Sequence, residues 1–65
     1  MTTATDPQVI AAITADLKAF GYTRLTEKQV KEQIKMALRG EQTTAIGVLA
    51  VEMLKKAGLW PGDEP

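Results

Sequence analysis

Residues 45–54 read AIGVLAVEML, and the first seven of them carry no polar side chain. Placed on a helix at about 100° per residue, this segment is apolar on nearly every side. The face that we expect to pack on the rest of the chain holds Ile46, Leu49, Ala50, Met53 and Ala57. The other side carries Val48, Val51 and Leu54. A helix that is apolar all round must be covered all round, so we expect this segment to be the central element of the fold.

The same stretch has a competing interpretation as a short buried strand at 46–51, because it is rich in β-branched side chains. A strand needs a partner, and the sequence offers no second strand candidate. Within a helix, Gly47 costs about 1 kcal/mol relative to alanine, and such a glycine is typical of a place where another backbone comes close. We therefore favour a helix that has a close neighbour at Gly47.

Three helix starts are marked by N-cap residues. Asp6 precedes a proline at the first helical position, where the missing N–H costs nothing. Thr26 is followed three residues later by Gln29, which is the spacing of a capping box. Thr43 or Thr44 can cap the third helix.

Three helix ends are marked by glycines at positions 21, 40 and 58. Tyr22 and Leu59 follow two of these glycines, as the Schellman motif favours when an apolar residue packs back on the last turn. These signals predict an all-α, compact three-helix bundle with helices at about 7–20, 27–39 and 45–57. We expect residues 1–65 to form one domain with a short C-terminal tail of Pro, Gly and acidic residues, and segments 1–5 and 61–65 to be frayed.

The other two helices have one apolar face each. The predicted core face of the first helix consists of Val9, Ile10, Ile13, Leu17 and Phe20. The predicted core face of the second helix consists of Val30, Ile34, Ala37 and Leu38. Each spacing follows the helical period, so both helices are expected to pack against the central segment 45–57.

A basic stripe runs along the second helix beside its core face. It consists of Arg24, Lys28, Lys31, Lys35 and Arg39. Such a stripe can follow nucleic-acid phosphates or meet an acidic protein, but it is also typical of a solvated face. Glu27 with Lys31, and Lys28 with Glu32, have the spacing of helical ion pairs. The chain has a net charge of +0 and a pI near 6.1, and no aromatic residue interleaves with the stripe, which argues against a nucleic-acid partner.

Composition argues against catalysis and against cross-links. The 65 residues include no His, Cys, Ser or Asn. Most catalytic nucleophiles and the usual general base are therefore missing, as are disulfides and the soft ligands of a zinc site. A domain of this size buries only about 60% of the surface of its unfolded chain and has little room to enclose a substrate. We predict a protein that is not an enzyme and that holds no cofactor and no metal.

No segment of the sequence is suited to a membrane. The longest apolar run is seven residues, far below the roughly 20 that cross a bilayer. The N-terminal segment MTTATDP has neither the basic start nor the apolar centre of a signal peptide. The absence of cysteine fits a reducing compartment, so we expect a cytoplasmic protein with no membrane partner.

Two family resemblances follow from the order of these segments. Phe20-Gly21-Tyr22, then a helix ending in Ala37-Leu38, then a helix with Ala50-Val51 and Leu54, is similar to ubiquitin-associated (UBA-like) domains. That resemblance implies a protein-binding patch made by the Gly-aromatic loop and the last helix, although segment 23–26 lengthens the loop and the second helix is longer than in that family. Segment 17–21 resembles the residues before the turn of helix-turn-helix DNA-binding modules, but the next helix starts too late. Both patterns recur in unrelated helical proteins, so neither assigns a family.

The function predicted from these features is protein binding, by a small regulatory or adaptor protein. We expect the contact surface to consist of Val48, Val51, Leu54 and Trp60, with Trp60 as either a lid or an anchor. The partner is another protein or a second copy of the chain, which would make a homo-oligomer. The alternative is a small nucleic-acid-binding regulator that uses the basic stripe. A subunit of a larger assembly has the same sequence features as the first of these.

Overall fold

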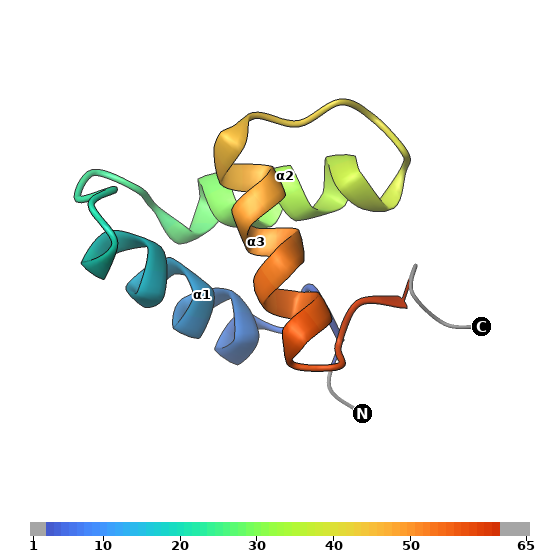
Figure 1. Cartoon of the computed structure of the whole chain (residues 1–65), viewed down its shortest axis with the longest axis horizontal. Coiled ribbons are helices and arrows are strands. Elements are labelled where there is room, and N and C mark those ends of the chain that lie inside the picture. The colour runs from blue at the N-terminus through green and yellow to red at the C-terminus, as the bar shows by residue number, and fades with distance from the viewer. Residues whose placement is uncertain (1–2, 62–65) are drawn as a thin grey trace.

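The computed structural model describes residues 3–61, and three helices form the described chain (Figure 1). Helix α1 spans Pro7–Ala19, α2 spans Glu27–Leu38 and α3 spans Ala45–Lys56. The all-α three-helix fold is confirmed, and each helix ends one residue before its expected end. Segment 46–51 lies inside α3, so its interpretation as a strand is wrong.

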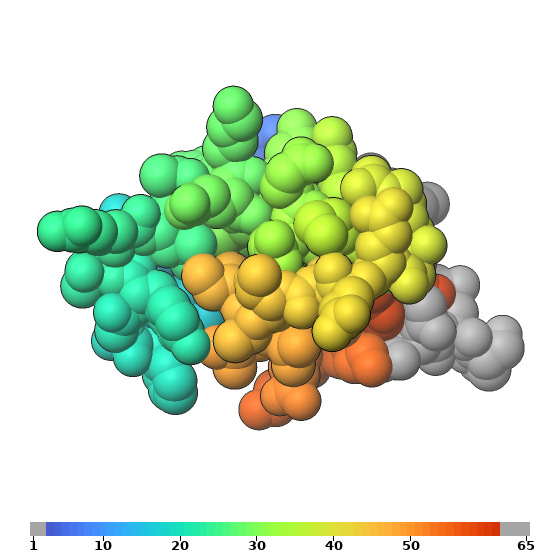
Figure 2. Space-filling model, turned by 90° about the horizontal axis from the view of Figure 1, so that it is seen from above, coloured from blue at the N-terminus to red at the C-terminus, as the bar shows by residue number. Residues whose placement is uncertain are grey.

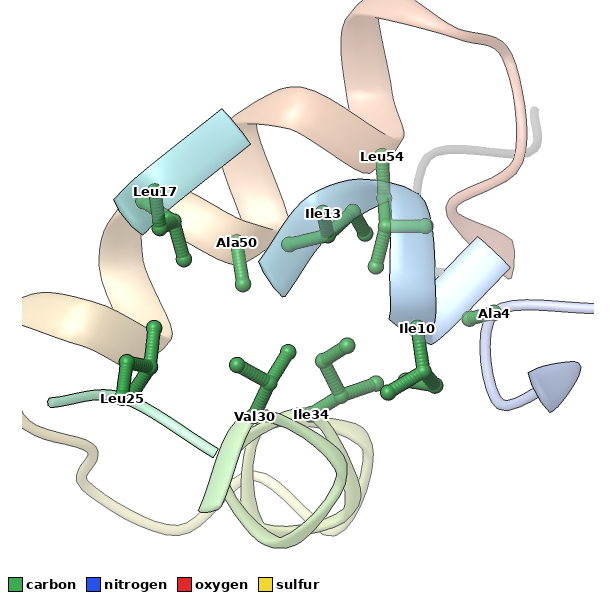
Figure 3. Packing of buried hydrophobic residues seen from close by; sticks show 9 residues of the cluster. All are labelled: Ala4, Ile10, Ile13, Leu17, Leu25, Val30, Ile34, Ala50 and Leu54. Carbon is green, nitrogen blue, oxygen red and sulfur yellow. The ribbon is translucent and has the colours of Figure 1, made fainter. Parts of the chain in front are cut away.

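The three helices pack around one core, and each of them contacts both others (Figure 1). Helix α3 packs most extensively on α2. It also packs on α1, where Leu54 lies beside Ile13 in the close view of the core (Figure 3). The expectation that residues 45–57 form the central element is wrong, because α1 packs more extensively on α2 than on α3.

The first two helices start as the sequence indicates. The Asp6 side chain accepts a hydrogen bond from the Gln8 backbone N–H at 2.8 Å. The capping box of α2 is closed in both directions, because Thr26 Oγ1 accepts from the Gln29 N–H at 3.2 Å and Gln29 Oε1 accepts from the Thr26 N–H at 3.0 Å. Thr44 is the N-cap residue of α3 but makes no side-chain cap bond, so the cap expected there is not formed.

All three helices end in a Schellman motif. At the end of α1, Gly21 has a φ of 128° and the Tyr22 N–H donates to the Leu17 carbonyl at 3.1 Å. At the end of α3, the Leu59 N–H donates to the Leu54 carbonyl at 2.9 Å. These are the bonds that define the motif, and both predictions are confirmed. The end of α2 has the same motif, with the polar Glu41 after Gly40, where the sequence lacks the apolar residue that marks the other two.

The core draws on all three helices and on two segments outside them (Figure 3). Its buried apolar residues are Ala4, Ile10, Ile13, Leu17, Leu25, Val30, Ile34, Ala50 and Leu54. Ala4 and Leu25 were not expected there. Ala4 is carried inward by a turn in which the Asp6 N–H donates to the Thr3 carbonyl at 3.1 Å, so it packs on the core although segment 1–5 is predicted to fray. The predicted fraying of residues 1–2 and 62–65 lies outside the described residues.

Three predicted core positions are wrong. Phe20 is 74% exposed and Leu38 is 43% exposed, and Ala57 is also exposed. Phe20 and Ala57 are C-cap residues, and Leu38 is the last residue of its helix. The chain turns away at these points, so a helical projection no longer predicts where the side chain goes. Tyr22 packs against the core in the loop that follows Phe20.

Candidate protein-binding groove

The outer face of α3 is less apolar than its sequence suggests. Val48 is 54% exposed, as expected, but Leu54 is 1% exposed and belongs to the core. Val51 is half-buried, and Trp60 is half-buried and packed against the core. The placement of Leu54 in a partner surface is therefore wrong, and Val48 is the one large apolar side chain of α3 that lies mostly in solvent.

The reason is that α3 turns a different side toward the core from the side that the sequence pattern predicts. The buried residues of this helix are Gly47, Ala50 and Leu54, which follow one another at helical spacing. Two of the three are small, so α2 approaches α3 most closely on this side. The pattern predicts a face centred on Ile46 and Met53, and these two residues are only half-buried.

The predicted close neighbour of Gly47 comes from the same chain. A Cβ atom at this position would lie 2.6 Å from Thr43 Oγ1 and 2.9 Å from Gln33 Oε1. Gln33 belongs to α2, and its Oε1 also accepts hydrogen bonds from the backbone N–H and the hydroxyl of Thr44. The glycine therefore makes room for a contact between α2 and the start of α3, and that contact is made by side chains rather than by a second backbone.

The basic stripe is fully on the surface. All five side chains, Arg24, Lys28, Lys31, Lys35 and Arg39, are exposed. The two expected helical ion pairs, Glu27 with Lys31 and Lys28 with Glu32, are not formed within residues 3–61, as is common where water competes for exposed charges.

Arg39 at the end of the stripe is paired. Its Nε and Nη2 atoms each donate to a carboxylate oxygen of Glu41 at 3.1 Å. The hydrogen bond from Arg39, followed by its positive charge, lowers the pKa of Glu41 below its ordinary value of 4.5. This pair reduces the charge that the stripe offers to a phosphate chain.

A hollow opens between the α1–α2 connection and the start of α3 (Figure 2). It has a volume of about 370 Å³ and is lined by residues of the connection, with Gln29 from α2 and Ile46 from α3. A second hollow of about 460 Å³ shares Gln29 and Ile46 with the first and extends along α2 to Thr44. We call the two together the α2–α3 groove. The connection lies at the left of Figure 2, and the start of α3 lies at the lower centre.

The α2–α3 groove combines an apolar lining with charged residues. Tyr22, Leu25 and Ile46 supply the apolar side chains. Arg24 lies in the connection, and Lys28 lies in the first turn of α2. Glu32 stands one turn beyond Lys28. Such a surface can bury an apolar side chain and contact carboxylates beside it.

The α2–α3 groove is not predicted by the sequence, because its residues come from three separate segments. Two signals pointed to parts of it. Tyr22 follows a helix-ending glycine and was expected to pack back on the last turn, and Arg24 begins the basic stripe. Nothing in the order of residues indicates that both lie beside Ile46.

The sequence matches no family model, no curated protein and no solved structure. The two family resemblances stated above are therefore unsupported by comparison. In the described part of the chain, no helix has the length and apolar character needed to cross a membrane. Within residues 3–61, no three His, Cys, Asp or Glu side chains come together, and a protein without metal stays a prediction.

Proposed function

We propose that the protein acts by binding a segment of another protein and that it does not catalyse a reaction. The observation that supports this most directly is the α2–α3 groove, where Tyr22, Leu25 and Ile46 line the first hollow and Ile46 also lines the second. Concave apolar surfaces with a few polar groups are the usual form of a binding site. The lack of His, Cys and Ser in the chain supports the non-enzymatic part of the proposal.

The contact is expected to be weak and reversible. One buried aliphatic or aromatic side chain contributes about 1.5–3 kcal/mol, and the ordering of the bound segment opposes that gain. We expect a Kd between about 10 μM and 1 mM for a short segment. A cytoplasmic location is part of the proposal, because a chain without cysteine suits a reducing compartment.

A display selection with a matched pair of variants tests this function. Random peptides on phage are selected on the immobilised protein and then assayed on Ile46→Gln and Val48→Gln. Ile46 lines the groove, whereas Val48 lies two residues away on the outer face of the same helix. Peptides that lose binding on Ile46→Gln and keep it on Val48→Gln support the proposal. Selected peptides that bind both variants equally, or the absence of selective peptides, contradict it. Circular dichroism of each variant checks that the helices are intact.

Self-association through α3 is a second candidate. It is supported by Val48, which is 54% exposed on the outer face of α3. The half-buried Val51 and Trp60 would complete this contact. Light scattering across a hundredfold range of protein concentration tests it, with Val48→Glu as the dissociating variant. A monomer at every concentration contradicts it.

Nucleic-acid binding by the basic stripe is a third candidate. Its support is the exposure of all five cations along one helix. The ion pair of Arg39 with Glu41 and the neutral chain weaken this candidate, and a salt titration described below tests it.

A further inference from the structure

We infer that the α2–α3 groove takes an acidic segment of a partner protein, in which a large apolar side chain is flanked on one side by carboxylates. This inference rests on the proposed function and adds the chemistry of the partner.

The charged groups around the groove come from two of the three elements that form it. The α1–α2 connection contributes Arg24, and α2 contributes Lys28 and Glu32. Helix α3 contributes Ile46 and its N-cap Thr44, neither of which is charged. Two cations and one anion therefore border the groove, and all three side chains are exposed.

The order of these charges gives the groove a direction. Arg24 lies at the first hollow, Lys28 lies at the second, and Glu32 follows one turn later along α2. Carboxylates of a bound segment are attracted at the Arg24 end, where a guanidinium can contact them with two parallel hydrogen bonds. They are repelled at the Glu32 end. The bound segment therefore has its acidic residues beside Arg24 and a neutral or basic residue beside Glu32.

The apolar part of the partner fits between these ends. Ile46 and Gln29 line both hollows, so the middle of the groove has one aliphatic and one amide side chain. Gln29 Oε1 is already used in the capping box of α2. An apolar side chain placed here contacts Ile46 and displaces water, whereas the flanking charges provide specificity and a faster encounter more than affinity.

Three synthetic peptides test the inference. Each carries the same phenylalanine and the same neutral residues, and they differ only in a flanking pair of Glu, Gln or Lys residues. Binding is measured by fluorescence anisotropy at low salt, and the site is located from the amide NMR shifts of Tyr22, Gln29 and Ile46. We expect the Glu peptide to bind best and the Lys peptide worst. Exposed charge pairs of this kind change affinity by roughly 2- to 5-fold each.

Three charge variants serve as the internal comparison. Arg24→Gln and Lys28→Gln should each weaken the Glu peptide by about 2- to 5-fold and leave the Gln peptide unchanged. Lys56→Gln is the matched control, because it removes a cation from the last turn of α3 and lies outside the lining of the groove. Lys56→Gln should leave the affinity of all three peptides nearly unchanged.

The outcomes separate the inference from the function on which it rests. Equal binding of the Glu and Gln peptides at the groove overturns the acidic partner and leaves the protein-binding function in place. If none of the peptides shifts Tyr22, Gln29 or Ile46 at millimolar concentration, both are wrong. If a single-stranded oligonucleotide shifts these residues at lower concentration than the Glu peptide, the acidic partner is a nucleic acid and the inference is overturned.

Discussion

The side-chain carbonyl oxygen of Gln33 accepts two hydrogen bonds from Thr44, one from the backbone N–H at 3.0 Å and one from the hydroxyl at 3.1 Å. The two residues are 11 positions apart and join the middle of α2 to the N-cap of α3. The side chain of Thr44 does not cap α3. Its hydroxyl and its backbone N–H donate to Gln33 of α2 instead. This contact holds the start of α3, and with it Ile46, against α2.

Gln33→Met should lower the free energy of unfolding by about 0.5–1.5 kcal/mol, because it removes the acceptor and keeps the length of the side chain. Gln33→Glu should keep the stability close to that of the parent, since a carboxylate accepts the same bonds and is favoured at a helix N-terminus. Urea unfolding followed by Trp60 fluorescence measures both variants. Equal stability of the Met and Glu variants would mean that the contact with Thr44 contributes nothing.

Gly47→Ala should destabilise the protein, although the same change in an open helix gains about 0.5–1 kcal/mol. The added Cβ would lie 2.6 Å from Thr43 Oγ1 and 2.9 Å from Gln33 Oε1, and overpacking of this kind costs about 1–3 kcal/mol. The measurement is the midpoint of urea unfolding. Thr43→Gly should recover part of the loss when it is combined with Gly47→Ala, and a stabilised single variant would show that the neighbours yield freely.

Leu54→Ala and Val48→Ala form a matched pair on α3. Leu54 is 1% exposed and Val48 is 54% exposed. Removal of the buried side chain should cost about 2–5 kcal/mol, which is a large share of the stability of a small domain, whereas the exposed one should change stability by no more than about 0.5 kcal/mol. Thermal unfolding followed by circular dichroism distinguishes them. A larger loss for Val48→Ala would show that its outer face is covered in solution.

Glu41 should titrate below its ordinary pKa of 4.5, because the hydrogen bond and the charge of Arg39 favour its ionised form. A carboxyl whose pKa is depressed in the folded protein stabilises the fold above its unfolded pKa, and this stabilisation is lost as the pH falls through the folded value. Carbon-13 NMR of the carboxyl group gives the midpoint. In Arg39→Gln the midpoint should rise toward 4.5, and an unchanged midpoint would mean that the ion pair does not persist in water.

Binding of duplex DNA should be weak at most and steeply dependent on salt. Contacts by all five cations of the basic stripe would give a slope of log K against log salt near −4.5, and loss of Arg39 to its pair with Glu41 would reduce the slope to about −3.6. Fluorescence anisotropy with a labelled duplex measures this slope. Sequence-specific binding that survives moderate salt, and that is lost when Lys31 and Lys35 are both changed to Glu, would place nucleic-acid binding first among the candidate functions.

The helix boundaries could be predicted from the sequence because their signals are local. Asp6, Thr26 and Gln29 act within three residues of the helix starts that they mark, and the glycines act within one turn of the helix ends. Burial was predicted well at the centres of helices, as for Ile13 and Ile34, and poorly at their ends, as for Phe20. At an end, the direction of a side chain depends on where the following loop goes, and helical periodicity carries no information about that.

The groove and the true core face of α3 depend on the packing of helices that are distant in the sequence. Periodicity defines an apolar helix but does not say which of its apolar sides faces inward, and on α3 nearly every side qualified. The close approach of α2 at Gly47 decides which side faces inward. Two small residues on that side let the two helices come together, and Leu54 on the same side then lies in the core. The same approach leaves Ile46 at one hollow with Gln29 of α2 and Tyr22 of the α1–α2 connection, a meeting of three segments that no local signal encodes.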